Sequence, residues 1–147
     1  ENEKKVKEYA SKRLKEEDYK FFGEVSNDQI LDLYDKYDVD FFINMSDSEG
    51  VPVSIMETMS MGIPVIARDV GGIREILSNK KGLLLDDITD REKTYNSINK
   101  FIKKCIKNDT MYNALQKECI KMWERDYNAN TNYNKFFKHI INEMEKN

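Results

Sequence analysis

The sequence predicts an α/β fold in which helices flank a parallel sheet, and three observations lead to that prediction. Short apolar runs centred near residues 20, 42, 65 and 84 alternate with segments of helical periodicity. The run over residues 39–46 is almost continuously apolar, which is typical of a strand buried on both faces. Each interval between runs has room for one crossover helix, as parallel strands require.

The first third of the chain predicts helix, strand and helix. Apolar residues at helical spacing indicate an amphipathic helix over residues 3–17. The segment YKFFG predicts a short strand over residues 19–23 that glycine closes. A second helix over residues 26–37 begins at the capping residue Ser26.

The middle of the chain predicts the remaining strands. A helix over residues 52–61 ends at Gly62 and leads into the apolar strand IPVIA. A Gly-Gly break then precedes the short helix IREIL, and KGLLLDD predicts the last strand. Three helices by periodicity follow the strands, over residues 90–107, 110–124 and 129–145.

Apolar residues of the last helices predict core packing. Phe136 and Phe137 lie on one apolar stripe, which we expect to pack into a core. Cys105 and Cys119 form no Cys-x-x-Cys pattern, so we expect two buried thiols in a reduced, cytoplasmic setting.

Composition argues against nucleic-acid binding and against a membrane-spanning segment in this chain. Its 147 residues form one domain's length and carry 24 basic and 27 acidic residues, a net charge of −3. That balance gives no basic footprint for nucleic acid. No apolar run approaches the roughly 18 residues of a membrane span.

The stretch SEGVPVSIMETMSMGIPVIARDVGG places Glu49 and Glu57 on the two sides of a helix start. Two interpretations of that start stay open. Ser54 and Glu57 match a capping box, in which Glu57 has a structural role. Alternatively, Pro52 is the first helical residue and no box forms.

The same stretch follows a predicted strand, and ligands bind at the carboxyl ends of parallel strands. Free N–H groups at a helix start favour phosphate, and Gly50 lets the backbone approach a ligand. Carboxylates accept hydrogen bonds from hydroxyl groups, which sugar and ribose both offer. The arrangement therefore predicts a pocket for a sugar nucleotide.

The string SEGVPVSIMETMSMGIPVIARDVGGIREIL resembles the donor-binding core of retaining glycosyltransferases with the GT-B fold, family 4. Glu49 and Glu57 match the Glu-x7-Glu motif of that family, and Glu75 matches a later position. VDFFINMS, FFGEVS, KGLLLDD and MWERDYNANTNY resemble neighbouring family segments, so the resemblance covers essentially the whole chain. It implies a Rossmann-like parallel sheet, the C-terminal half of a GT-B fold, with extra C-terminal helices.

The resemblance also implies roles for individual residues. Glu57 would accept hydrogen bonds from the ribose of the nucleotide, and Glu49, as the catalytic residue, would meet hydroxyls of the transferred sugar. Backbone N–H groups around Gly50 and Val51 would face the diphosphate. Backbone near Val25 would meet the base.

Other positions near the motif have simpler expectations. Gly71 and Gly72 are candidate donor-binding residues, and we expect a tight turn at the wall of the donor pocket rather than a remnant of a phosphate loop. Arg74 is expected to pair with a local acid rather than to reach a phosphate. The family needs no metal ion or other cofactor, so we expect none. Asp38-Val39-Asp40 matches a metal motif of another fold, but it opens a buried strand and we expect it to be solvated.

Two departures from the family pattern limit the expected activity. Val51 and Pro52 replace an aromatic residue and a second glycine, which removes one N–H donor for phosphate. The Arg/Lys pair that clamps the diphosphate and the whole acceptor domain have no counterpart in this sequence. We therefore expect residues 1–147 to be a single donor-binding domain, truncated at its N-terminal side and inactive alone.

The predicted function is that of a hexosyltransferase-type glycosyltransferase in polysaccharide or cell-envelope biosynthesis. It would transfer a sugar from a nucleotide-diphosphate sugar, with retention, to a saccharide or lipid-linked acceptor. Alternatives are a non-catalytic nucleotide-binding module and a GT-B-fold sugar-nucleotide epimerase. The sugar, the base and the acceptor stay open, as does association with the inner face of the membrane.

Overall fold

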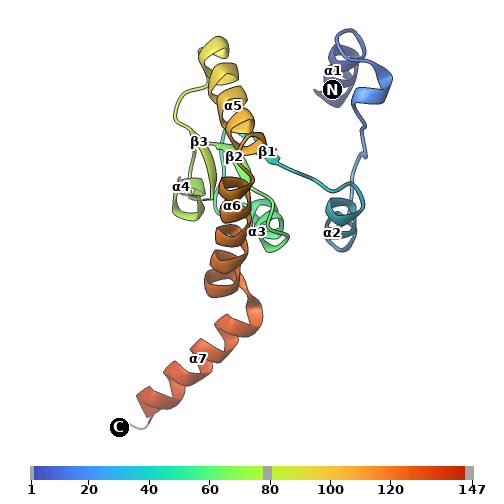
Figure 1. Ribbon diagram of the computed structural model, residues 1–147. Helices are drawn as coiled ribbons and strands as arrows, with labels where there is room; N and C mark the ends of the chain where they lie inside the picture. Colours follow the sequence, from blue (N-terminus) through green and yellow to red (C-terminus); the bar gives the residue numbers. More distant parts are fainter. Residues whose placement is uncertain (1, 78–80, 145–147) are drawn as a thin grey trace. The chain divides into compact units, whose positions relative to one another are not determined.

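The computed structural model describes residues 2–77 and 81–144, which divide into two compact units, residues 1–30 and 31–147 (Figure 1). The first unit contains α1 (Asn2–Ser11) and the 3₁₀ turn η1 (Glu16–Asp18). Helix α2 (Asn27–Lys36) begins in the first unit and ends in the second.

The predicted strand over residues 19–23 is wrong. Tyr19 has extended dihedral angles, with φ −149° and ψ 158°, but residues 19–23 belong to no strand. A strand needs a neighbouring strand for its backbone hydrogen bonds. The described part of the first unit contains no other extended segment that pairs with it.

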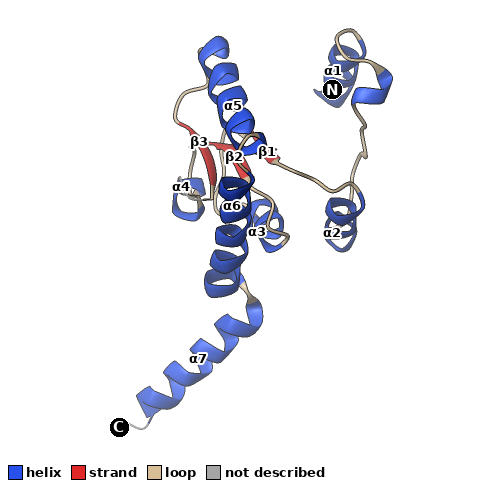
Figure 2. Ribbon diagram, in the orientation of Figure 1, coloured by secondary structure: helices blue, strands red, loops and turns tan. Residues whose placement is uncertain are grey.

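The second unit is built on a parallel sheet whose strand order is β1–β2–β3 (Figure 2). The strands are β1 (Phe42–Asn44), β2 (Val65–Arg68) and β3 (Gly82–Leu85). Asn44 pairs with Ala67, and Ala67 pairs with Leu84, so the three carboxyl ends lie at one edge of the sheet. This confirms the predicted α/β class with a parallel sheet flanked by helices.

Strand β1 is shorter and more exposed than the apolar run over residues 39–46 predicts. It is an edge strand of the described sheet, and Ile43 is 50% exposed, so the prediction of burial on both faces is wrong. Pairing stops at Asn44 because the Ser46 N–H bonds to the Asn44 side chain and leaves the strand ladder.

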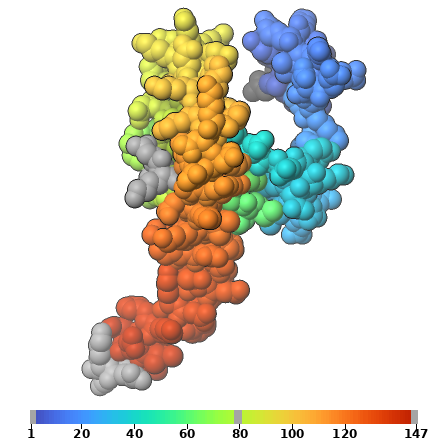
Figure 3. Space-filling view, viewed as in Figure 1, coloured from blue at the N-terminus to red at the C-terminus, as the bar shows by residue number. Residues whose placement is uncertain are grey.

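Helices separate and follow the strands along the chain. They are α3 (Val53–Ser60), α4 (Ile73–Ile76), α5 (Arg91–Ile106), α6 (Asp109–Met122), the π-helical turn η2 (Trp123–Tyr127) and α7 (Ala129–Met144). Asp90 and Asn108 cap α5 and α6 by accepting hydrogen bonds from Lys93 N and Met111 N. Figure 3 shows α5 and α6, coloured yellow to orange, as one continuous face.

The core lies between the sheet and the helices α3, α4 and α6. Its central residues are apolar and almost fully buried: Ile55, Met59, Val65, Ala67, Ile73, Ile76, Leu77, Cys119 and Met122. Burial raises the pKa of the Cys119 thiol to about 12. Both Cys119 and Cys105 are free, buried thiols, as the sequence predicts.

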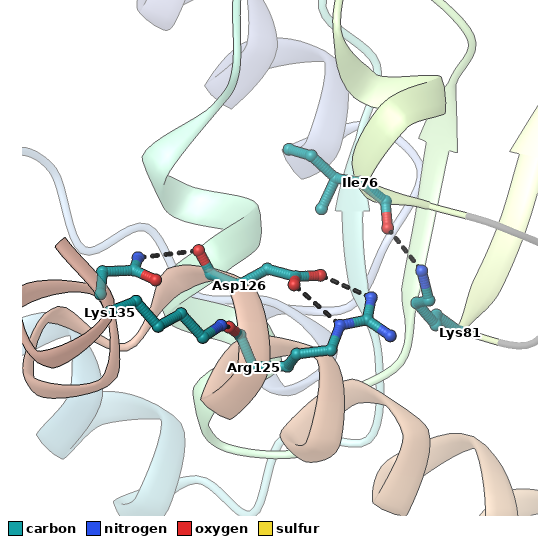
Figure 4. A network of polar contacts seen from close by, with 6 residues as sticks. Ile76, Lys81, Arg125, Asp126 and Lys135 are labelled. Carbon is teal, nitrogen blue, oxygen red and sulfur yellow. Dashed lines mark hydrogen bonds and ion pairs between the residues drawn. The ribbon is translucent and has the colours of Figure 1, made fainter. Parts of the chain in front are cut away.

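Figure 4 shows polar contacts of Lys81, directly before β3, and of Arg125 and Asp126 in η2. Lys81 donates to the Ile76 carbonyl at 3.1 Å, and the Cys119 thiol donates to the Lys81 carbonyl. The Arg125 guanidinium donates two hydrogen bonds to the Asp126 carboxylate, at 2.7 Å from Nε and 2.6 Å from Nη2, in a bidentate ion pair. The bonds of Lys81 lie at the amino end of β3, opposite to the carboxyl edge of the sheet.

The predicted core packing of the α7 stripe is wrong. Phe136 and Phe137 are 57% and 59% exposed, and their rings contact each other with centroids 6.1 Å apart. The helix meets the described chain mainly through η2, at its own N-terminal end. No described residue therefore covers the stripe.

Candidate functional site

The loop after β1 holds the first predicted site residue, Glu49, at the carboxyl edge of the sheet. The Asn44 side-chain amide donates a hydrogen bond to Oε1 of Glu49 at 3.2 Å. The side-chain oxygen Oδ1 of Asn44 accepts a hydrogen bond from the Ser46 N–H at 2.9 Å. One side chain thus fixes both the loop backbone and the carboxylate.

Glu49 stays ionised more easily than an ordinary glutamate. The side chains of Ser46 and Asn44 hold the pKa of Glu49 below its usual value. Hydrogen bonds to the charged form of a carboxyl group have this effect. The half-buried carboxylate is therefore an acceptor over the physiological pH range.

The turn after β2 supports the same loop from its other side. Gly71 has φ +52°, and a Cβ atom on Gly71 would overlap the carbonyl oxygen of Glu49. The Gly72 N–H donates to the Gly50 carbonyl at 2.9 Å. The predicted tight turn is therefore present, and its two glycines allow the two loops to touch.

Helix α3 begins at Val53, one residue after Pro52, and carries Glu57 in its second turn. Pro52 precedes the first helical residue, and no side chain caps this helix start. The capping box of Ser54 and Glu57 is therefore absent, which leaves Glu57 without that structural role. In the described ranges no hydrogen bond or ion pair joins the Glu57 carboxylate to another side chain.

Buried neighbours fix the position of α3. The Thr58 hydroxyl donates to the Ser54 carbonyl at 2.6 Å, and Ile55 and Met59 are fully buried in the core. Glu57 is half-buried beside them. The structure thus places Glu49 and Glu57 before and after one helix start, as the spacing predicts.

Gly50 and Val51 lie between the two glutamates and face open space. A Cβ atom on Gly50 would meet nothing within 4 Å, and Val51 is 49% exposed. A ligand can therefore approach this stretch of backbone closely. Val25 is half-buried in the first unit, and its position relative to this loop lies outside what the structure describes.

Basic side chains near the loop are held in ion pairs. Arg68, at the end of β2, pairs with Asp47. Arg74 pairs with Asp69 and, at 2.8 Å, with Asp86, as predicted for a surface ion pair. Two arginines therefore lie at this edge of the sheet, each held by acids of the neighbouring loops.

Asn44 is the site residue that sequence reasoning missed. Within the apolar run FFIN it is the single polar side chain, and it is only 9% exposed. A buried polar group in a strand needs hydrogen-bond partners. That mismatch was the available signal, and it points to the loop that follows.

Residues 2–77 and 81–144 contain neither a membrane-spanning helix nor a cluster of metal-binding side chains. None of these helices is both long enough and apolar enough to cross a membrane. No three of the described His, Cys, Asp and Glu side chains gather in a way that could hold a metal ion.

A protein-family comparison matches most of the chain. The model for glycosyl transferases group 1 matches residues 1–118. This region includes the sheet, α3 and both glutamates.

Curated relatives match a shorter region. The O-antigen biosynthesis glycosyltransferase WbnH of Escherichia coli is 38% identical over 74 residues, which is 50% of this chain and 20% of that protein. The putative teichuronic acid biosynthesis glycosyltransferase TuaC of Bacillus subtilis is 35% identical over 63 residues, 43% of this chain and 16% of that protein. The matches thus span about a fifth of those relatives.

Among solved structures, sucrose-phosphate synthase from Thermosynechococcus elongatus has a similar fold. The TM-score is 0.71 with 16% sequence identity, over 95% of this chain and 34% of that one. At this identity the likeness concerns the fold alone.

Proposed function

Because the chain belongs to the family of glycosyl transferases group 1, we propose that it binds the donor of a hexosyltransferase-type enzyme. The donor in this proposal is a nucleotide-diphosphate sugar, used with retention of configuration as in family 4. The observation that carries the proposal is the fixed Glu49 carboxylate at the carboxyl edge of the sheet, directly before the start of α3.

The proposal assigns a chemical role to each part of the loop. Glu57 accepts hydrogen bonds from the ribose hydroxyls, and Glu49 accepts them from hydroxyls of the transferred sugar. Open backbone at Gly50 and Val51 receives the diphosphate, and the turn at Gly71 and Gly72 supports that loop. No metal ion is required in this proposal.

The curated relatives support the wider setting of the proposal. They are glycosyltransferases of O-antigen and teichuronic acid biosynthesis, so we propose a saccharide or lipid-linked acceptor in cell-envelope polysaccharide synthesis. The proposed location is cytoplasmic, with contact to the inner face of the membrane through the acceptor. The proposal covers donor binding and assigns neither acceptor binding nor a cationic clamp to the described residues.

The test measures donor binding and turnover in the full-length protein. A panel of UDP-, GDP- and ADP-sugars is titrated by calorimetry, and products are identified with saccharide and lipid-linked acceptors. We expect one sugar nucleotide to bind and to yield a glycoside, and Glu57→Ala to weaken binding of the free nucleotide as well as the donor. Unchanged nucleotide affinity in Glu57→Ala contradicts the ribose assignment, and a free epimerised donor as product contradicts transfer.

A further inference from the structure

Asn44 is a polar residue in a place where the fold favours an apolar one. It is 9% exposed and pairs with Ala67 of β2, a residue that is fully buried. Phe42, two residues earlier on the same face of β1, packs against the apolar core. Packing alone thus favours an apolar side chain at position 44.

Both polar groups of Asn44 are used within the next five residues of the chain. Its carbonyl oxygen accepts from Ser46 N at 2.9 Å, and its Nδ2 donates to Oε1 of Glu49 at 3.2 Å. The second bond joins a neutral donor to a carboxylate, the stronger class of hydrogen bond. It occupies one acceptor site of the Glu49 carboxylate, and the Ser46 side chain also bonds to this carboxylate. A carboxylate has about four acceptor sites, so acceptor capacity for a ligand is left.

The backbone of Glu49 is fixed separately, because its carbonyl oxygen lies against Gly71. Backbone contact sets the position of Glu49, and Asn44, together with the Ser46 side chain, sets the direction of its carboxylate. We propose that Asn44 is a positioning residue, which holds the Glu49 carboxylate so that one oxygen faces the hydroxyls of the transferred sugar. This inference rests on the proposed function.

The position of Asn44 predicts that its loss weakens binding of the sugar nucleotide and leaves binding of the free nucleotide diphosphate unchanged. Nucleotide contacts in the proposed site belong to Glu57 and to the backbone after Gly50, neither of which bonds to Asn44. Loss of a hydrogen bond that orients a charged acceptor costs roughly a tenfold factor or more in binding. That factor should appear for the sugar nucleotide and be absent for the free nucleotide diphosphate.

The experiment compares three variants of the full-length protein. Asn44→Asp keeps an oxygen for Ser46 N–H but sets a second carboxylate against Glu49. Asn44→Leu removes both bonds and is well suited to the buried site. Asn96→Asp, on an exposed part of α5, is the matched control for the added charge.

Calorimetry measures dissociation constants for four donors, UDP-glucose, UDP-N-acetylgalactosamine, GDP-mannose and ADP-glucose, each beside its free nucleotide diphosphate. For the donor that binds wild type best, Asn44→Asp and Asn44→Leu should raise the ratio of donor to diphosphate dissociation constants about tenfold or more. Asn96→Asp should leave that ratio unchanged.

Urea unfolding of the same proteins distinguishes a positioning role of Asn44 from a role in the stability of the fold. Asn44→Leu should unfold at the wild-type urea concentration or higher, although its donor affinity falls. Equal weakening of donor and diphosphate, or a wild-type ratio in Asn44→Asp, overturns the positioning role and leaves the proposed function standing. A wild type that binds no donor and no diphosphate overturns the proposed function, and the positioning role with it.

Discussion

The two glutamates of the candidate site are held in different ways. Glu49 lies on a loop, and its position depends on the polar side chain of Asn44 and on the close contact with Gly71. Glu57 lies on α3, whose position depends on fully buried apolar residues such as Met59. The loop residue Glu49 therefore needs specific polar partners, whereas the position of the helix residue Glu57 is fixed by the core packing of its helix.

The largest expected change in the free energy of unfolding comes from a substitution in the core that holds α3 and its residue Glu57. Met59→Ala removes a fully buried side chain and should lower the free energy of unfolding by about 2–5 kcal/mol. Urea unfolding measures this change. Met61→Ala, at a residue 37% exposed, is the control and should stay within about 0.5 kcal/mol of wild type.

The next effect comes from separating the loops that hold Glu49. Gly71→Ala requires a side chain at φ +52° and presses it onto the Glu49 carbonyl, so unfolding should become easier by about 2 kcal/mol or more. The hydrogen bond from Asn44 to Glu49 should weaken as well, which shifts the Asn44 side-chain amide signals in NMR spectra.

Gly50→Ala is the matched control for that substitution. A Cβ atom on Gly50 meets nothing within 4 Å, so stability should change by no more than about 0.5 kcal/mol. Equal losses of stability in Gly71→Ala and Gly50→Ala would show that contact between the loops is not what holds Glu49.

A smaller effect concerns the charge on Glu49. Its pKa lies below the ordinary value of 4.5, because Ser46 and Asn44 favour the ionised form. The resulting contribution to stability is present above about pH 4.5 and is lost as the pH falls through the lowered pKa. Glu49→Gln should remove this part of the acid dependence of unfolding.

Carboxyl ¹³C titration of wild type checks the direction of that shift. A Glu49 midpoint at or above 4.5 would contradict the hydrogen-bonded arrangement. In Asn44→Leu the midpoint should move upward, toward the ordinary value, because one donor to the carboxylate is gone.

The smallest effect is expected at the surface ion pairs beside the loop. Arg74 is 65% exposed and pairs with Asp86, which is 80% exposed, and with Asp69, whose side chain is 11% exposed. Arg74→Ala should lower the free energy of unfolding by less than about 1 kcal/mol, and salt should reduce that difference further. A larger loss in urea unfolding would mean that Arg74 supports the loops.

Patterns that depend on local chemistry were predictable from the sequence. The parallel sheet, the helix after Pro52 and the turn at Gly71 follow from apolar periodicity, a fixed φ and a residue that tolerates positive φ. The order of Glu49 and Glu57 around one helix start follows from the same reasoning.

Features that depend on distant partners were not predictable in the same way. Residues 19–23 have the composition of a strand, but strand formation needs a neighbour that a local pattern does not reveal. Phe136 and Phe137 match a core stripe, although no described residue covers them. The role of Asn44 depends on where a side chain five residues later points, which only the structure gives.

The contact between the loops after β1 and β2 has a consequence for protein engineering. Glu49 and Gly50 meet Gly71 and Gly72 across about twenty residues of intervening chain. In a chimera with a homologue whose crossover point lies between these two loops, each loop would come from a different protein. The two loops would then lack the partner with which each one evolved. The two turns should therefore be transplanted together as one segment, with its junctions outside residues 44 and 72.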